Sequence, residues 1–161
     1  MDTAISLVKD NSTGLRERLI GAWKLVSYEE CPVDGSPSVY PMSDKPQGII
    51  MYTPDGYMSA QLMHPERQRF ASGDWFNGTQ EEYRAEATSY IAYSGRFDVD
   101  EAKQSLTHSM FVSLFPNWLG QTQPRVVRIE GDRLYLSTAA PISSGGRTVN
   151  SYLCWRRAEA N

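Results

Sequence analysis

Residues 48–63 read GIIMYTPDGYMSAQLM, and this stretch carries the clearest structural signal of the chain. Two segments rich in apolar residues flank the tetrapeptide Thr53-Pro54-Asp55-Gly56. Proline presets φ for a type I turn, and glycine accepts the left-handed conformation that closes it. Such turns join neighbouring antiparallel strands. The stretch therefore predicts a β-hairpin and, around it, an antiparallel sheet.

Segments on both sides of this hairpin alternate between apolar and polar residues, as half-buried strands do. Six such segments lie at residues 21–30, 93–99, 105–114, 125–129, 134–138 and 148–157. Together with the two hairpin strands they make eight predicted strands. Eight antiparallel strands in sequential order can close into a barrel, which removes the sheet edges and leaves room inside for side chains or one small ligand. We predict an all-β fold, a single eight-stranded antiparallel barrel, with a flat sandwich as the alternative.

The same alternation assigns side chains to faces of the strands. In residues 21–30, Trp23 and Leu25 share one face, and Tyr28 lies on the other. In residues 105–114 the even positions form the inward face, and they are apolar apart from His108. The segment 141–146, rich in glycine and serine, is expected to be a loop.

One helix is predicted in the middle of the chain. Thr79 and Glu82 have the spacing of a capping box, and Tyr83, Ala87 and Tyr90 recur at helical intervals. The helix should span residues 80–90 and lie near one mouth of the barrel. Residues 64–78 before it are polar and glycine-rich, which indicates either a lid-like loop or a variable surface segment.

Length and composition narrow the class of protein. A chain of 161 residues with 40% apolar and 22% charged residues indicates one globular domain, in which residues 1–18 form an extension and residues 19–157 the barrel. The net charge of -3 counts against nucleic acid as a partner. No apolar run is long enough for a membrane span and no secretory signal is evident. We expect a cytoplasmic protein, a monomer or a homodimer, with no membrane partner.

Five segments together resemble one known family. They are Gly21-Ala22-Trp23, YTPDGYMSAQ at 52–61, YIAYSGRF at 90–97, SLFPNWLGQTQPR at 113–125 and LCWRR at 153–157. Through them the chain resembles the small lipocalin-like domain family of bacteria and fungi. The resemblance implies a barrel with a capped cavity. It also implies, for some members, cofactor-free cyclase, isomerase or dehydratase activity in secondary metabolism.

A barrel of this kind closes by pairing its first strand with its last. That pairing is expected to bring Trp23 near Trp155, with Arg156 or Arg157 lying across the indole. The same register sets Cys31 opposite residue 147. Cys154 then lies several residues further along the strand, so we predict that both cysteines are free.

Four residues are candidates for chemistry inside the barrel. His108 interrupts an inward apolar face and is the predicted general acid or base, because imidazole titrates near neutral pH. Arg125 shares a face with Val127 and is the predicted charge stabiliser, whereas Tyr93 and Tyr52 would orient the ligand. For each, a purely structural role, with the polar group satisfied by a neighbour, is the alternative.

Further residues are predicted to contact the ligand without chemistry. Three strand residues should line the cavity, namely Met58, Leu62 and Met110. Four loop residues are candidates for closing over it, namely Trp75, Phe76, Asn117 and Trp118. The aromatic content of 11% fits a cavity lined in this way.

Other chemistries find little support. With two histidines and no pair of ligands at metal-binding spacing, we expect no metal, and no cofactor. Neither a phosphate-binding glycine loop nor the G-x-S-x-G motif of serine hydrolases is present. We therefore predict a cofactor-free cyclase, isomerase or dehydratase acting on a small aromatic or polyketide-like molecule. The alternatives are a non-catalytic carrier of a small hydrophobic or aromatic ligand, and a barrel filled by side chains.

Overall fold

A computed structural model of the chain describes residues 13–160; the expectation about a leader concerns residues outside this range. The elements in chain order are α1 (Leu15–Leu19), β1 (Gly21–Pro32), β2 (Gln47–Tyr52), β3 (Tyr57–Met63), α2 (Gln80–Thr88), β4 (Tyr90–Asp100), β5 (Ser105–Ser113), the 3₁₀ helix η1 (Pro116–Trp118), β6 (Thr122–Glu130), β7 (Arg133–Thr138), β8 (Ile142–Ser144) and β9 (Arg147–Arg157).

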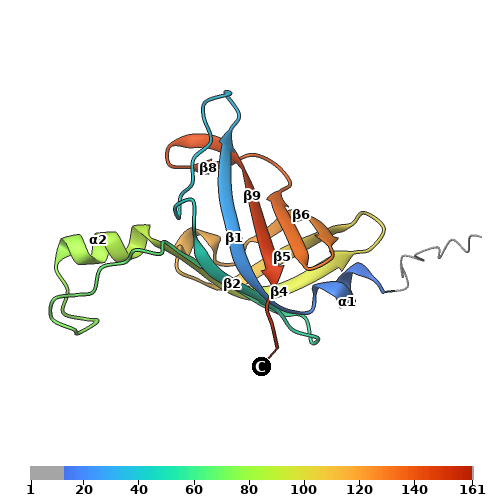
Figure 1. Cartoon of the computed structure of the whole chain (residues 1–161), viewed down its shortest axis with the longest axis horizontal. Coiled ribbons are helices and arrows are strands. Elements are labelled where there is room, and N and C mark those ends of the chain that lie inside the picture. The colour runs from blue at the N-terminus through green and yellow to red at the C-terminus, as the bar shows by residue number, and fades with distance from the viewer. Residues whose placement is uncertain (1–12, 161) are drawn as a thin grey trace, which may run out of the picture.

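The strands form a closed antiparallel barrel. Each strand from β1 to β6 pairs with the one that follows it, β7 pairs with β9, and β9 pairs back onto β1. Figure 1 shows β1 and β9 side by side, running upright through the barrel. The predicted eight-stranded barrel is confirmed for the described residues, and the sandwich alternative is wrong because no edge is left open between β1 and β9.

The hairpin of residues 48–63 forms as predicted. Gly56 has φ +93, and its N–H donates a hydrogen bond to the carbonyl of Thr53 over 3.1 Å. The Thr53 N–H donates in turn to the carbonyl of Tyr57 over 2.8 Å, which continues the ladder into β2 and β3.

The segment expected to be a glycine- and serine-rich loop contains a short additional strand. β8 pairs with the first part of β9, while β7 pairs with a later part of the same strand. Gly145 and Gly146 have φ +55 and +76, and two successive positive φ values are typical of the tight turns that join hairpin strands. The expectation of a loop was wrong because these two glycines alone form the turn.

A β-bulge changes the inward face of β1. The register against β9 shifts between Leu25 and Ser27. Trp23 and Leu25 are buried as expected, but beyond the shift the buried residues are Tyr28 and Glu30. Alternation assigned Tyr28 to the outward face, and this was wrong because one extra residue in a strand reverses the direction of all later side chains.

A second irregularity has the same effect on β5. Its pairing with β4 shifts at Ser94 and Gly95, so that Leu106, His108 and Met110 point inward while Val112 is 56% exposed. Leu114 beyond it is 49% exposed. The even positions of this strand are therefore inward only up to Met110.

The end of the barrel away from β8 is closed by the N-terminal helix α1 (Figure 1). Residues 1–18 were expected to form an extension, yet Leu15 is 3% exposed and packs in the core beside Leu19, which is 0% exposed. The Trp23 indole N–H donates to the carbonyl of Leu19 over 2.9 Å. The Arg157 guanidinium lies 3.7 Å from the centre of the Trp23 indole, which confirms the expected cation–π contact.

The register between β1 and β9 differs from the expected one by two residues. Trp23 lies opposite Arg157, and Cys31 lies opposite Asn150 instead of residue 147. The bulge in β1 lies between these two positions and adds one residue to the difference, which is why it is larger at Cys31 than at Trp23. Both cysteines are free, as predicted.

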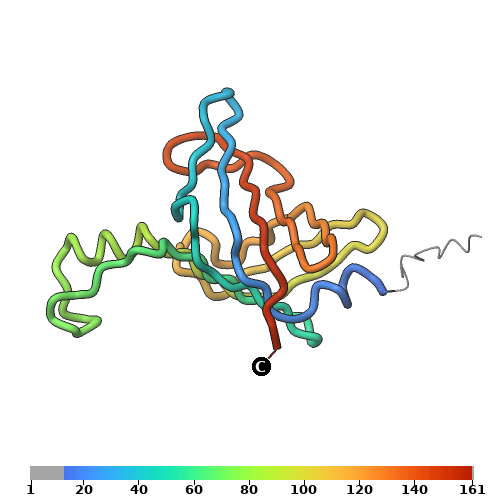
Figure 2. The backbone as a smooth tube through the Cα atoms, in the orientation of Figure 1, coloured from blue at the N-terminus to red at the C-terminus, as the bar shows by residue number. Residues whose placement is uncertain are grey.

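Residues 64–89 form an arm that leaves the barrel and returns to it, as the tube in Figure 2 shows. The arm contains α2, which ends at Thr88, two residues before its expected end. The predicted capping box is present, with the Glu82 N–H donating to the Thr79 side chain over 3.2 Å. No residue of α2 is buried. Only the last part of the helix, at Ala87, approaches the mouth of the barrel cavity.

Candidate ligand-binding cavity

The barrel encloses a cavity of about 760 Å³ at the end that carries β8. Ordinary small-molecule sites have volumes of about 300–1,000 Å³, so this cavity has the size of a ligand site. Several lining side chains near the mouth, including Leu114, Phe115 and Ile142, are between 39% and 50% exposed. The cavity therefore opens to solvent on this side.

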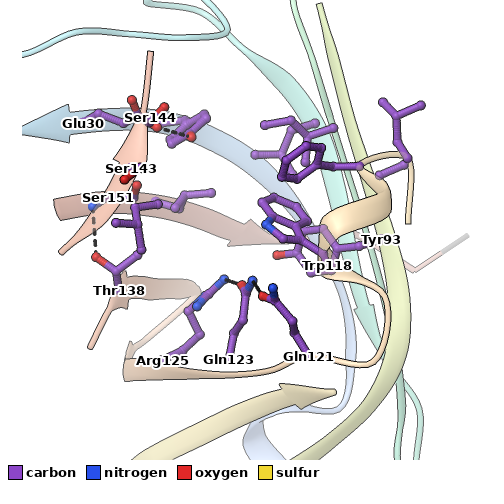
Figure 3. A pocket seen from close by; sticks show the side chains of 18 of the residues that line it. Glu30, Tyr93, Trp118, Gln121, Gln123, Arg125, Thr138, Ser143, Ser144 and Ser151 are labelled. Carbon is purple, nitrogen blue, oxygen red and sulfur yellow. Dashed lines mark hydrogen bonds between the residues drawn. The ribbon is translucent and has the colours of Figure 1, made fainter. Parts of the chain in front are cut away.

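One wall of the cavity is aromatic. Tyr93 from β4 and Trp118 from η1 meet edge to face, with ring centres 5.4 Å apart, and Phe115 packs on Trp118 with ring centres 5.6 Å apart. Pro116 at the start of η1 favours the short helical turn that brings Trp118 over the opening. Figure 3 shows Tyr93 and Trp118 together on this side of the cavity. Such a wall offers ring faces and edges to a flat ligand.

Arg125 from β6 supplies a positive charge to the cavity. Its guanidinium donates hydrogen bonds to Gln123 Oε1 over 2.6 Å and to the carbonyl of Pro124 over 3.1 Å. The side chain is half-buried, and no carboxylate of the described residues forms an ion pair with it. Burial raises the pKa of Tyr93, and the nearby Arg125 opposes this rise. The arrangement fits a carbonyl or another electron-rich group of a ligand.

The opposite wall carries a buried acid. Tyr28 donates a hydrogen bond of 2.6 Å to Glu30 Oε1, and Glu30 is 2% exposed. Burial, followed by this hydrogen bond, raises the pKa of Tyr28, so the phenol stays protonated. Ser151 from β9 lines the same wall, and Figure 3 shows Glu30 and Ser151 on the side away from Trp118.

His108 lies in the barrel core and is not among the residues that line the cavity. It is fully buried, and its Nε2 lies 2.9 Å from the hydroxyl of Tyr52. Burial, with a smaller contribution from Arg125, lowers the pKa of His108 to about 3. The imidazole is therefore neutral at pH 7.

The structure brings only some of the predicted site residues to the cavity. Arg125, Tyr93, Leu62 and Trp118 line it. Others that were predicted to contact the ligand, namely Tyr52, Met58 and Met110, are buried in the core with His108 and do not line it.

The remaining loop candidates lie elsewhere. Asn117 is exposed, and its carbonyl accepts a hydrogen bond from Gln121 Nε2 over 2.7 Å. Trp75 and Phe76 stack on each other in the arm, are 71% and 88% exposed, and are not cavity residues.

The contact between Tyr28 and Glu30 inside the barrel was not predicted from the sequence. Both residues sit in the segment GAWKLVSYEE, where simple alternation places Tyr28 outward. An acidic residue beside a tyrosine on a strand carries no sign of burial by itself. Only the bulge between Leu25 and Ser27 turns both side chains into the barrel.

No group of three or more histidine, cysteine or acidic side chains that could hold a metal ion occurs within residues 13–160. Over the same range, no helix has the length and apolar character needed to cross a membrane.

A closed eight-stranded barrel with an internal cavity defines the class of small-molecule-binding barrels. Within this class, the profile of the lipocalin-like domain family matches residues 20–158, and the chain belongs to that family. A protein of Aspergillus oryzae, the 4'-hydroxy-3'-methoxypropiophenone carrier protein ppsC, is 40% identical over 106 residues. The alignment covers 62% of this chain and 96% of the Aspergillus protein.

Proposed function

We propose that this protein is a non-catalytic carrier that holds a small aromatic molecule in the cavity of its barrel. The observation that carries the proposal is the 760 Å³ cavity, with Tyr93 and Trp118 on one wall and Arg125 beside them. The similarity to a protein named as the carrier of an aromatic ketone supports it. A ring would pack against the aromatic wall, and the guanidinium of Arg125 would donate to a carbonyl oxygen. The ligand would be an aromatic or polyketide-like compound of secondary metabolism, carried in the cytoplasm.

Catalysis by cyclisation, isomerisation or dehydration is the second candidate, and a specific observation favours it. A carboxyl group, Glu30, and a guanidinium, Arg125, face the same cavity, and such a pair can move a proton and stabilise the charge that forms. His108 fits this role less well, because a neutral imidazole with a pKa of about 3 outside the cavity wall does not take up a proton at pH 7. We assign His108 a structural role through its contact with Tyr52.

The carrier function is tested by titrating the purified protein with 4'-hydroxy-3'-methoxypropiophenone and following tryptophan fluorescence. We expect saturable quenching that is lost in Trp118→Phe and kept in Trp75→Phe, because Trp118 lines the cavity and Trp75 does not. Replacing Trp118 by alanine should weaken binding by roughly tenfold, since an aromatic contact of this kind is lost.

Mass spectrometry of the ligand after incubation distinguishes the two candidates. A carrier returns the compound unchanged, whereas an enzyme returns a product, and an enzyme that uses His108 loses turnover in His108→Ala. The absence of any saturable binding would contradict the carrier proposal.

A further inference from the structure

The wall of the cavity formed by β1 and β9 holds polar groups that the fold satisfies only in part. Glu30 accepts one hydrogen bond, from the hydroxyl of Tyr28 to Oε1 over 2.6 Å. Among residues 13–160, no other hydrogen bond and no ion pair reaches the Glu30 side chain. A carboxyl group that is 2% exposed thus has one oxygen without a partner, and this oxygen belongs to a side chain that lines the cavity.

Ser151 gives a second and independent sign of a missing partner. Its side chain is 4% exposed and lines the same cavity, and its hydroxyl lies close enough to that of Tyr28 to lower the pKa of that phenol. No group within the described part of the chain, however, forms a hydrogen bond of ordinary distance and angle with it. The backbone N–H of Ser151 is satisfied separately, because it donates to Thr138 Oγ1 over 3.1 Å. Buried polar groups in native proteins nearly always have a partner, so the free hydroxyl points to a bound molecule.

A structural role would explain the burial of the Glu30 carboxyl group only if that group held a neighbouring segment in place. The neighbouring loop is held instead by the backbone of Glu30, which exchanges two hydrogen bonds of 2.9 Å with the backbone of Val39. The carboxyl group itself takes no part in this bridge. Burying an acid beside a cavity without such a use costs stability, which a bound ligand would offset.

We infer that Glu30 and Ser151 form a subsite that binds a neutral hydroxyl group of the aromatic ligand. The inference rests on the proposed function and adds which functional group of the ligand is recognised. The ligand hydroxyl donates its hydrogen to the free oxygen of Glu30, and the Ser151 hydroxyl donates to the ligand oxygen. Tyr28 fixes the orientation of Glu30 through the other carboxyl oxygen.

The chemistry of the subsite excludes close relatives of such a ligand. A methyl ether has no hydrogen to donate, so it would leave the Glu30 oxygen buried without a partner and would press a methyl group against it. A ligand carboxylate would meet a second acid. At the far wall, Arg125 receives the opposite kind of group, an acceptor, so the two walls fix the direction in which the ligand enters.

The test compares 2-naphthol with 2-methoxynaphthalene, which differ only in the hydroxyl hydrogen and the methyl group, by fluorescence titration of the whole chain. The wild-type protein should bind 2-naphthol about tenfold to a hundredfold more tightly, the range expected for a buried hydrogen bond to an acid. Glu30→Gln should reduce this preference to less than about threefold, since the amide presents a donor in place of the free acceptor.

Glu29→Gln is the matched control, because it makes the same chemical change one residue away on the opposite face of β1, and it should keep the full preference. Ser151→Ala should weaken 2-naphthol severalfold and leave the ether unchanged. Thermal unfolding of each variant shows that it is folded. If Glu30→Gln does not fold, the wild-type ratio and Ser151→Ala still decide the question.

Equal affinity of the wild-type protein for the two naphthalenes would overturn the hydroxyl subsite while leaving the carrier function in place. Equal preference in Glu30→Gln and the wild type would overturn the role of Glu30. Binding of neither compound to the wild type would overturn the carrier proposal and the subsite together.

Discussion

Inside the barrel, the His108 imidazole contacts the hydroxyl of Tyr52 and is shielded from water. Charging it would place a cation in an apolar core within the field of Arg125, which is why burial and that guanidinium depress its pKa. The same residue in an unfolded chain titrates near 6.5. The difference makes His108 a source of pH-dependent stability.

We predict that the free energy of unfolding falls by about 3 kcal/mol between pH 7 and pH 4 because of His108 alone. Over this range the unfolded state binds a proton that the folded state, with a pKa of about 3, does not accept. Stability is therefore present above pH 6.5 and is lost as the pH falls toward 3. Urea denaturation of the wild type and of His108→Gln, at several pH values, measures the difference.

Comparing the two proteins isolates the effect of His108. Acidic groups with lowered pKa values, such as Asp34 and Asp100, contribute equally to the pH dependence of stability in both. Parallel losses of stability in the two proteins would contradict the depressed pKa of His108.

At the scale of single elements, two irregularities decide which side chains reach the cavity. The bulge after Leu25 turns Tyr28 and Glu30 inward. The shift beside Gly95 ends the inward face of β5 at Met110 and lets the chain continue into η1. Gly95 permits this shift, because a Cβ at this position would lie 1.8 Å from the backbone oxygen of Ser109.

We predict that Gly95→Ala lowers the free energy of unfolding by about 3 kcal/mol or more, since the added methyl group collides with backbone that cannot move aside. Gly73→Ala is the comparison. Gly73 has φ +69 but nothing within 4 Å of an added Cβ, so only backbone strain of about 1 kcal/mol is expected. Chemical denaturation of both variants tests this, and equal losses would show that the close approach of β4 and β5 is not the cause.

The whole molecule has one closed end, one open end and an arm. Leu19, Trp23 and Arg157 close one end, and the cavity opens at the other. The arm of residues 64–89 is held largely by its own contacts, such as Phe70 against Tyr83 with ring centres 5.4 Å apart. Few apolar groups of the arm are buried against the barrel, so its stability is local.

We therefore predict that backbone amides of residues 66–78 exchange with deuterium much faster than those of β1 and β9, as hydrogen-exchange mass spectrometry can measure. Adding a ligand should slow exchange around Trp118 and leave the segment around Trp75 unchanged, because only Trp118 lines the cavity. Slower exchange around Trp75 in the presence of ligand would instead support the lid role that its sequence suggests.

The number, direction and order of the eight main strands follow from the sequence alone, as do the turn at Gly56 and the cap at Thr79. These features depend on local properties, namely the period of two in a strand and the conformations that glycine, proline and capping residues favour. The inward direction of Arg125 and Leu62 followed from the same alternation, whereas Trp118 was a candidate because it is an aromatic residue in a loop.

Contacts between distant strands, in contrast, determine which side chains face the cavity and how buried groups such as His108 are charged. A bulge is set by pairing with a distant strand, so the inward turn of Tyr28 and Glu30 has no local signal. The neutrality of His108 likewise depends on burial and on Arg125, which lies on another strand. Both features depend on contacts between strands that are far apart in the sequence, and these contacts leave His108 in the core while Glu30 and Arg125 line the cavity.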